Sequence, residues 1–306
     1  MHVGSHTKTR SELSIDGVQV ALTNLEKVLW PKTSIKKYDF LKFLTVVAPH
    51  MLPFLRDRLL TVIRFPNGVL HESFYQKNCP DYAPEFVKTV QREGIDYIVC
   101  SNLPALFWLG NQAAIEYHIP FQTIKSNDPS EIVLDLDPPS QNEFSLAVEA
   151  ALILKEVFDS LKLLSFIKTS GNKGLQIYLP LDGSFSYAQT RVFTSFIATF
   201  LETKYPKSFT TERLKKNRNN RLYIDFLQHG EGKTIIAPYS LRGNENALMA
   251  TPLHWSEVNE SLRPTDFPME EGIRRISNGI LPFENFFEAK QKQPFDMVLK
   301  KLTSSE

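Results

Sequence analysis

The chain has 306 residues, of which 42% are hydrophobic, and a formal net charge of +1. This length and apolar content suit a globular catalytic domain. The near-neutral charge excludes a protein that binds nucleic acid through a global basic field, so any contact with nucleic acid must come from local basic clusters. No segment approaches the roughly 20 apolar residues of a membrane span, so no membrane partner is expected.

The first part of the chain predicts alternating helices and short strands. Apolar spacing predicts helices over residues 37–51 and 103–117, and strands over residues 60–64 and 97–99. Cys79 and Cys100 lack the spacing of a metal site or a disulfide framework, which favours reduced thiols and a cytoplasmic location.

The strand predicted at residues 132–137 contains two acids in an otherwise apolar run. Asp135 and Asp137 lie two residues apart, so both carboxylates point to one face of the strand. Pro138 and Pro139 end the strand just past the second acid. Such oxygen ligands suit Mg²⁺ or Mn²⁺, although an Asp-x-Asp taken alone is more often a strand edge with two solvated acids.

Beyond this strand, Ser140 and Glu143 predict a capping box for a helix whose apolar stripe runs from Phe144 to Leu161. Strands follow near residues 164–168 and 175–179.

The turn between those two strands, residues 170–174, has the composition of a phosphate-binding loop. Gly171 and Gly174 expose backbone N–H groups, Ser170 adds a hydroxyl, and Lys173 adds a positive charge. An ordinary hairpin turn is an equally weighted alternative for the loop alone, and the turn is not a P-loop because it lacks Gly-Lys-Ser/Thr.

The last third of the chain predicts a helix at 187–203, strands near 222–227 and 233–237 that complete the catalytic layer, and a short helix at 255–262. Asp225 interrupts the first of these strands and is a candidate third carboxylate. A basic run precedes it, which would attract phosphates but is most often a solvated face; it comprises Arg213, Lys215, Lys216, Arg218 and Arg221.

Taken in order, Asp-Leu-Asp at 135–137, Ser-Gly-x-Lys-Gly at 170–174, Asp225 and Ala-Pro-Tyr-Ser-x-Arg at 237–242 resemble the polymerase domain of bacterial DNA ligase D. That domain belongs to the archaeo-eukaryotic primase superfamily. The resemblance covers roughly residues 14 to 290 and implies an α/β (α+β) fold, with a primase-type catalytic core of mixed or antiparallel sheets flanked by helices. The expected catalytic domain is 14–292, with 1–13 and 293–306 as polar tails or linker remnants.

The activity that the resemblance implies is template-directed, primer-extending nucleotidyl transfer during non-homologous end joining. It would fill gaps and add nucleotides at broken DNA ends, with a preference for ribonucleoside triphosphates. The implied partners are DNA ends, gapped duplex with a 5′-phosphate, nucleoside triphosphates, Ku and a DNA ligase domain, in the bacterial cytoplasm at the nucleoid.

The resemblance also implies roles for individual residues. Asp135, Asp137 and Asp225 match the catalytic acids that hold two Mn²⁺ or Mg²⁺ ions. The residues that match nucleotide-binding positions are Arg64, Phe74, Tyr75, His118, Ser170, Lys173, Gln176, Arg218, Gln228 and Arg242. The residues that match a pocket for the downstream 5′-phosphate are Asn24, Lys27 and Lys37.

Each of these roles has a simpler alternative when the resemblance is set aside. A histidine such as His118 is more often structural than a ligand, and an aromatic pair such as Phe74–Tyr75 is more often part of the core. Asn24, Lys27 and Lys37 would then be three unrelated surface residues. One position departs from the pattern, because members commonly have Gly-Leu-His where this chain has Gly174-Leu175-Gln176. Glutamine can donate a hydrogen bond but cannot carry the charge of an imidazolium, so reduced but retained transfer is expected.

Two other functions are compatible with these residues. A metal-dependent phosphodiesterase also uses three acids and basic residues, although it needs no loop for a triphosphate. A weakly active or inactive module that binds and bridges DNA ends is the non-enzymatic alternative.

Overall fold

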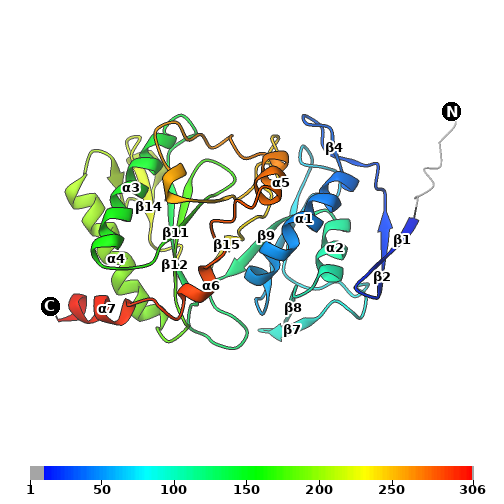
Figure 1. The fold of residues 1–306 in the computed structure, drawn as a ribbon, viewed down its shortest axis with the longest axis horizontal. Helices are drawn as coiled ribbons and strands as arrows, with labels where there is room; N and C mark the ends of the chain where they lie inside the picture. Colours follow the sequence, from blue (N-terminus) through cyan, green and yellow to red (C-terminus); the bar gives the residue numbers. More distant parts are fainter. Residues whose placement is uncertain (1–9, 305–306) are drawn as a thin grey trace.

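The computed structural model describes residues 10–304, and Figure 1 shows two sheets side by side, each with its own helices. The larger sheet is six-stranded and antiparallel except for the β13–β14 pair. In spatial order its strands are β13 (Phe209–Thr210), β14 (Leu222–Asp225), β10 (Glu131–Asp137), β12 (Leu175–Pro180), β11 (Phe166–Thr169) and β16 (Pro252–Leu253).

Helices cover one face of this sheet. They are α3 (Phe144–Ser160), α4 (Tyr187–Lys204) and α7 (Phe295–Thr303). Their apolar residues form one core with Ile132, Leu134 and Leu136 of β10. Since side chains alternate along a strand, Val133 and the two acids of β10 point to the opposite face, toward the second sheet.

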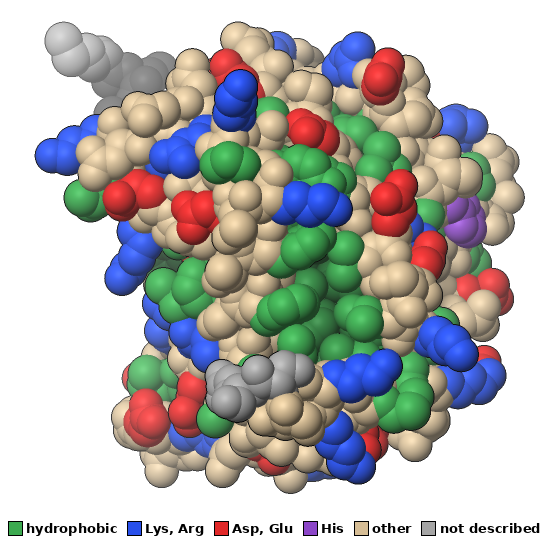
Figure 2. All heavy atoms as spheres, turned by 90° about the vertical axis from the view of Figure 1, so that its left-hand side faces the viewer, with side chains coloured by type: hydrophobic (Ala, Val, Ile, Leu, Met, Phe, Trp, Pro, Cys, Tyr) green, Lys and Arg blue, Asp and Glu red, His purple; other side chains and the backbone are tan. Residues whose placement is uncertain are grey.

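The outer side of these helices retains apolar side chains. Leu152 on α3 and Val192 and Phe196 on α4 are exposed, and Figure 2 shows apolar side chains running down the middle of this side between charged ones.

The second sheet is four-stranded and belongs to a separate core. Its strands are, in order, β15 (Thr234–Ile236), β9 (Ala114–Pro120), β5 (Thr61–Arg64) and β6 (Phe74–Gln76). The helices packed in this core are α1 (Lys37–Leu55), α2 (Leu103–Asn111) and α5 (Met269–Ser277), and α6 (Phe286–Ala289) lies between the sheets.

Three two-stranded ribbons and two 3₁₀ turns complete the fold of residues 10–304. Two-stranded ribbons are formed by β1 (Arg10–Ile15) with β2 (Val18–Thr23), β3 (Val28–Trp30) with β4 (Ile35–Lys36), and β7 (Thr89–Arg92) with β8 (Ile95–Ile98). Single 3₁₀ turns occur at η1 (Lys215–Asn217) and η2 (Trp255–Glu257).

The helix predicted over 103–117 is too long. Helix α2 ends at Asn111, Ala113 adopts a positive φ of 57°, and the following residues form β9. This strand pairs with β5 on one side and β15 on the other, so sheet pairing overrides the helical spacing of the sequence. The strand predicted at 233–237 therefore lies in the four-stranded sheet, and the prediction that it completes the catalytic layer is wrong.

The predicted capping box of α3 does not form. The helix begins at Phe144 with no side-chain cap, because the Ser140 hydroxyl donates to the Glu143 carboxylate and accepts from the Asn142 backbone N–H, which closes a turn instead. The helix predicted at 255–262 is reduced to η2.

Both predicted tails contain regular structure within residues 10–304; residues 1–9 and 305–306 lie outside the described residues. Residues of β1 pair with β2, and α7 buries Phe295, Val298 and Leu299. Those three positions share one helical face, which explains why this polar segment packs on the domain.

Candidate active site

Three carboxylates lie on the face of the six-stranded sheet that is opposite helices α3, α4 and α7. Asp135 on β10 lies directly opposite Asp225 on β14 in the strand register, and Asp137 lies two residues further along on the same face. Local sequence explains the placement, since Leu134 and Leu136 occupy the opposite face in the helical core.

Asp135 has a strongly raised pKa. Burial is the main cause, and together with the negative charges of Asp137 and Asp225, and against the lowering effects of the Gln176 hydrogen bond and the Lys168 charge, it raises the pKa of this carboxyl to about 6. Close like charges in a half-buried position favour the binding of a cation.

Asp137 and Asp225 have protein partners of their own. Asp137 lies 2.9 Å from Lys173 Nζ and 3.9 Å from the Arg218 guanidinium. Asp225 Oδ1 accepts from the Tyr223 hydroxyl at 3.2 Å and from the Gln228 backbone N–H at 3.0 Å. Among residues 10–304 no three His, Cys, Asp or Glu side chains are already gathered as a metal-binding group, in keeping with Asp137 being held by its two cations.

The donor set nevertheless fits a hard divalent cation. All three ligands are carboxylates, they come from adjacent strands, and two of them disfavour ionisation of the third. A divalent ion bound here would offset both the burial and the carboxylate repulsion that raise the pKa of Asp135.

The loop at 170–174 is shaped by its own serine. The Ser170 hydroxyl accepts from the backbone N–H groups of Asn172 and Gly174, at 3.2 and 3.0 Å. A Cβ on Gly174 would lie 2.3 Å from the Leu136 carbonyl oxygen, so only glycine allows the loop to approach the catalytic strand this closely. Lys173 Nζ also donates to the Pro139 carbonyl, at 3.2 Å, so the loop is tied to the end of β10.

Gln176 lies deeper than a loop contact. It is 3% exposed, its Nε2 donates to Asp135 Oδ1 at 3.0 Å, and its Oε1 accepts from Lys168 Nζ at 2.6 Å. Both ends of the amide are therefore directed to protein groups.

A second cationic cluster is organised by Glu116 on β9, which sequence analysis missed. Its carboxylate lies 2.7 Å from Arg242 and 2.9 Å from His118 Nε2, and also accepts from the Gly243 backbone N–H. Burial raises the pKa of Glu116, but His118, Arg242 and Gly243 outweigh this effect and lower it. Burial lowers the pKa of His118 despite its carboxylate partner.

Two further predicted nucleotide contacts lie beside Asp225. Arg218 stacks over the Tyr223 ring, with 3.9 Å from its guanidinium carbon to the ring centroid. Gln228 is fixed by a hydrogen bond from its Nε2 to the Thr234 carbonyl, at 2.7 Å.

The aromatic pair lies on the surface. Phe74 and Tyr75 on β6 are 45% and 72% exposed, so the alternative that they belong to the core is wrong. Arg64 lies over the Phe74 ring at 5.2 Å and donates to Gln76 and Gln112.

Residues of the predicted phosphate pocket come together at the start of α1. Lys27 Nζ donates to Asn67 Oδ1 at 3.2 Å, and its backbone N–H donates to the Asn24 carbonyl. Lys37 is buried, with its Nζ donating to the Asn111 carbonyl at 2.8 Å. Burial, together with the nearby charges of Lys27 and Arg64, lowers the pKa of Lys37 to about 8.

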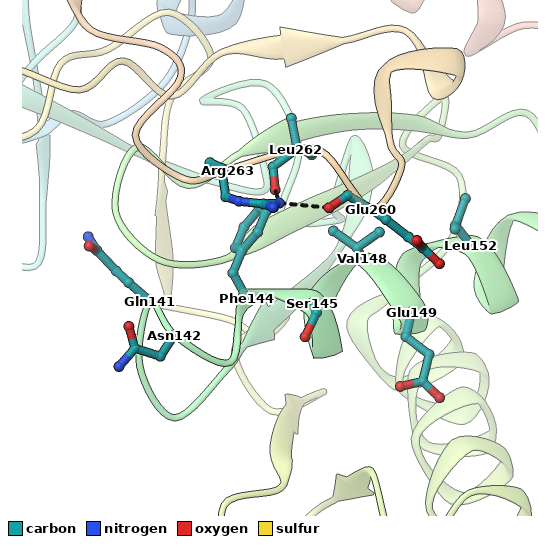
Figure 3. Close-up of a pocket in the computed structure, with 10 residues that line it drawn as sticks. All are labelled: Gln141, Asn142, Phe144, Ser145, Val148, Glu149, Leu152, Glu260, Leu262 and Arg263. Atoms are coloured by element: carbon teal, nitrogen blue, oxygen red, sulfur yellow. Dashed lines mark hydrogen bonds between the residues drawn. The ribbon is translucent and has the colours of Figure 1, made fainter.

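A cavity of about 700 Å³ opens between the first half of α3 and the segment at 260–263 (Figure 3). Phe144 and Val148 line it, and both belong to the core on the helical face of the sheet. The carboxylates point to the other face, so this cavity is separate from the candidate site.

Sequence analysis missed Glu116, Lys168 and Tyr223 as members of the site. Glu116 shares a strand face with His118, two residues away, and Lys168 is a lysine within an apolar strand. A charged residue in a strand that is otherwise buried is the signal that could have identified both.

No helix in the described part of the chain is long and apolar enough to cross a membrane.

Comparison with known proteins gives a consistent result. Residues 36–283 match the family model described as LigD, primase-polymerase domain. The bifunctional non-homologous end joining protein LigD of Bacillus subtilis is 48% identical over 285 residues, which cover 93% of this chain and 47% of that protein. The multifunctional LigD of Mycolicibacterium smegmatis is 32% identical over 247 residues, covering 78% of this chain and 32% of that protein.

A solved structure supports the same assignment. The polymerase domain of Mycobacterium tuberculosis Ligase D, in complex with DNA, superimposes with a TM-score of 0.82 at 31% identity, covering 88% of this chain and 98% of that one. The present chain thus spans about half the length of its Bacillus subtilis relative and nearly all of a polymerase domain.

Proposed function

Because the chain belongs to the LigD primase-polymerase domain family, we propose that it is a template-directed nucleotidyltransferase that extends primers at gaps and broken ends during non-homologous end joining. The observation that carries the proposal is the register of Asp135 opposite Asp225, with Asp137 on the same face and the 170–174 loop tied to the end of the same strand. The DNA in the related structure supports DNA as the substrate class.

Asp135, Asp137 and Asp225 would hold two divalent ions, Mn²⁺ or Mg²⁺. When bound, such ions lower the pKa of a primer 3′-hydroxyl and neutralise a pyrophosphate leaving group. Asp225 would chiefly bind the ion next to the nucleophile, which is the primer 3′-hydroxyl. Gln176 orients Asp135 through its amide N–H, and Tyr223 and the Gln228 backbone orient Asp225.

The cations around the carboxylates fit a triphosphate. Lys173 is held near Asp137 and can turn to a phosphate oxygen, and Ser170 shapes its loop by accepting hydrogen bonds from the Asn172 and Gly174 N–H groups. The other groups proposed to contact the nucleotide are Arg64, His118, Ser170, Arg218, Gln228 and Arg242. Gln176, whose amide is directed to Lys168 and Asp135, is not among them.

The exposed aromatic pair and the lysine cluster would contact DNA. Phe74 and Tyr75 have exposed aromatic side chains, which suits stacking on a base. Asn24, Lys27 and Lys37 would bind the 5′-phosphate on the downstream side of a gap. Ku and a ligase domain are the proposed partners, and the bacterial nucleoid is the proposed location.

Extension of a gapped duplex bearing a downstream 5′-phosphate tests the function. Mn²⁺ with ribo- or deoxyribonucleoside triphosphates would be supplied to the wild type, to Asp135→Ala and to Asp296→Asn, an acid exposed on α7. Addition by the wild type and Asp296→Asn but not by Asp135→Ala is expected, and the preferred sugar follows from the same assay. Intact DNA binding without any addition would favour the end-binding module, and cleavage of the duplex would favour the phosphodiesterase.

A further inference from the structure

Lys168 on β11 is buried in surroundings that are unusual for a lysine. It is 0% exposed, and Nζ donates to Gln176 Oε1 at 2.6 Å and to the Thr169 carbonyl at 3.3 Å. Within residues 10–304 it makes no ion pair with a carboxylate inside 4.0 Å. Desolvating an amine without such a partner is unfavourable, so stability alone would favour an apolar residue here.

The contacts of Lys168 determine the orientation of Gln176. Lys168 Nζ donates to the Gln176 side chain, although burial lowers the pKa of this lysine well below its usual value. An ionised carboxylate such as that of Asp135 can only accept a hydrogen bond. The amide oxygen of Gln176 must therefore face Lys168, which leaves the amide N–H group to face Asp135, at 3.0 Å. The three residues form a chain of donors that runs in one direction, from Lys168 to Asp135.

The strand register places this chain in one row. Asp225, Asp135, Gln176 and Lys168 are successive partners across β14, β10, β12 and β11. Lys168 places a basic nitrogen at the end of this row, one strand beyond Gln176.

We infer that Lys168 is a positioning residue that acts through Gln176 to fix the Asp135 carboxylate for binding a divalent cation. The inference rests on the proposed function, since it takes Asp135 to be a metal ligand. Without Lys168 the amide of Gln176 could turn over and present its oxygen to the carboxylate, which would repel Asp135 from its productive orientation.

Titration of the purified chain with Mn²⁺ alone, followed by electron paramagnetic resonance, tests the inference without turnover. Lys168→Met is expected to weaken Mn²⁺ binding about tenfold, the size of effect typical for groups that orient a ligand. Lys290→Met is the matched control, because Lys290 is also largely buried but contacts Glu131 at the other end of β10. It should leave the Mn²⁺ affinity unchanged.

A double-mutant cycle tests the route through Gln176. Gln176→Leu alone should weaken Mn²⁺ binding, and adding Lys168→Met to it should change the affinity less than twofold further. Equal effects of Lys168→Met in both backgrounds, or an unchanged affinity in the single variant, would overturn the inference. Lys168→Gln, which keeps a shorter polar side chain, replaces Lys168→Met in the cycle if the latter does not fold.

The same titration separates the inference from the proposed function. Wild-type protein that binds no Mn²⁺ would overturn the proposed function and the inference with it. Wild-type binding that is lost in Asp135→Ala but is identical in Lys168→Met would overturn the inference alone.

Discussion

Asp135 is held where its ionised form is unfavourable. Burial and two neighbouring carboxylates raise its pKa from 3.8 to about 6. The folded state therefore binds this proton more tightly than the unfolded chain, and the stability that Asp135 contributes when protonated is lost as pH rises between 3.8 and about 6. A site arranged to bind a cation thus destabilises the protein that lacks one.

Asp135→Asn should consequently stabilise the metal-free protein. Because one pKa unit corresponds to about 1.4 kcal/mol, the gain at neutral pH is expected to be about 3 kcal/mol, and it should vanish near pH 4. Urea unfolding at several pH values, with a chelator present to keep the protein free of metal, measures this gain in the free energy of unfolding. Asp296→Asn is the control variant. A gain that is the same at every pH would show that ionisation of Asp135 is not its source.

At the scale of elements, the 170–174 loop depends on a single hydroxyl. Ser170→Ala removes the acceptor for two backbone N–H groups, so it should lower the free energy of unfolding by about 1–3 kcal/mol. It should also raise the KM for the nucleotide by a larger factor than it lowers kcat. Ser126→Ala is the matched control, since Ser126 Oγ accepts from the Asp128 N–H in a turn before β10. Equal KM values for the two variants would contradict a role of this loop in binding triphosphate.

Helix α7 gives a second test at this scale. Phe295 is fully buried and its ring lies 5.3 Å from Phe193 and 4.9 Å from Phe185. Phe295→Ala should lower the free energy of unfolding by about 3–5 kcal/mol, whereas Met297→Ala, at a 57% exposed position, should change it by less than about 0.5 kcal/mol. Equal denaturation midpoints would mean that α7 does not belong to the cooperative unit.

Across the whole molecule, the sequence predicted what depends on local spacing. The strand that carries Asp135 and Asp137 could be predicted because its alternation is contained in seven residues. Strand β9 could not, because its pairing with β5 and β15 joins segments distant in the chain. The row from Asp225 to Lys168 was hidden for the same reason, since only the register across four strands reveals it.

The proposed catalytic carboxylates and the proposed 5′-phosphate pocket belong to different sheets. The carboxylates lie on the six-stranded sheet, whereas Lys27 and Lys37 lie beside the four-stranded sheet, close enough to Arg64 for their charges to interact. Because the net charge is only +1, DNA affinity must depend on such local clusters, and single lysines should have separable effects.

Lys27→Ala is therefore expected to weaken binding of a gapped duplex with a 5′-phosphate about tenfold, leave binding of the 5′-hydroxyl duplex unchanged, and reduce the salt dependence by about one unit of slope. Fluorescence anisotropy at several salt concentrations measures all three, with Lys300→Ala on α7 as the control. An equal loss of affinity for both duplexes would place Lys27 on the general DNA surface.

Asp135→Ala should keep the preference for the duplex with a 5′-phosphate while losing primer extension, because the carboxylates and the lysines of the phosphate pocket belong to different sheets.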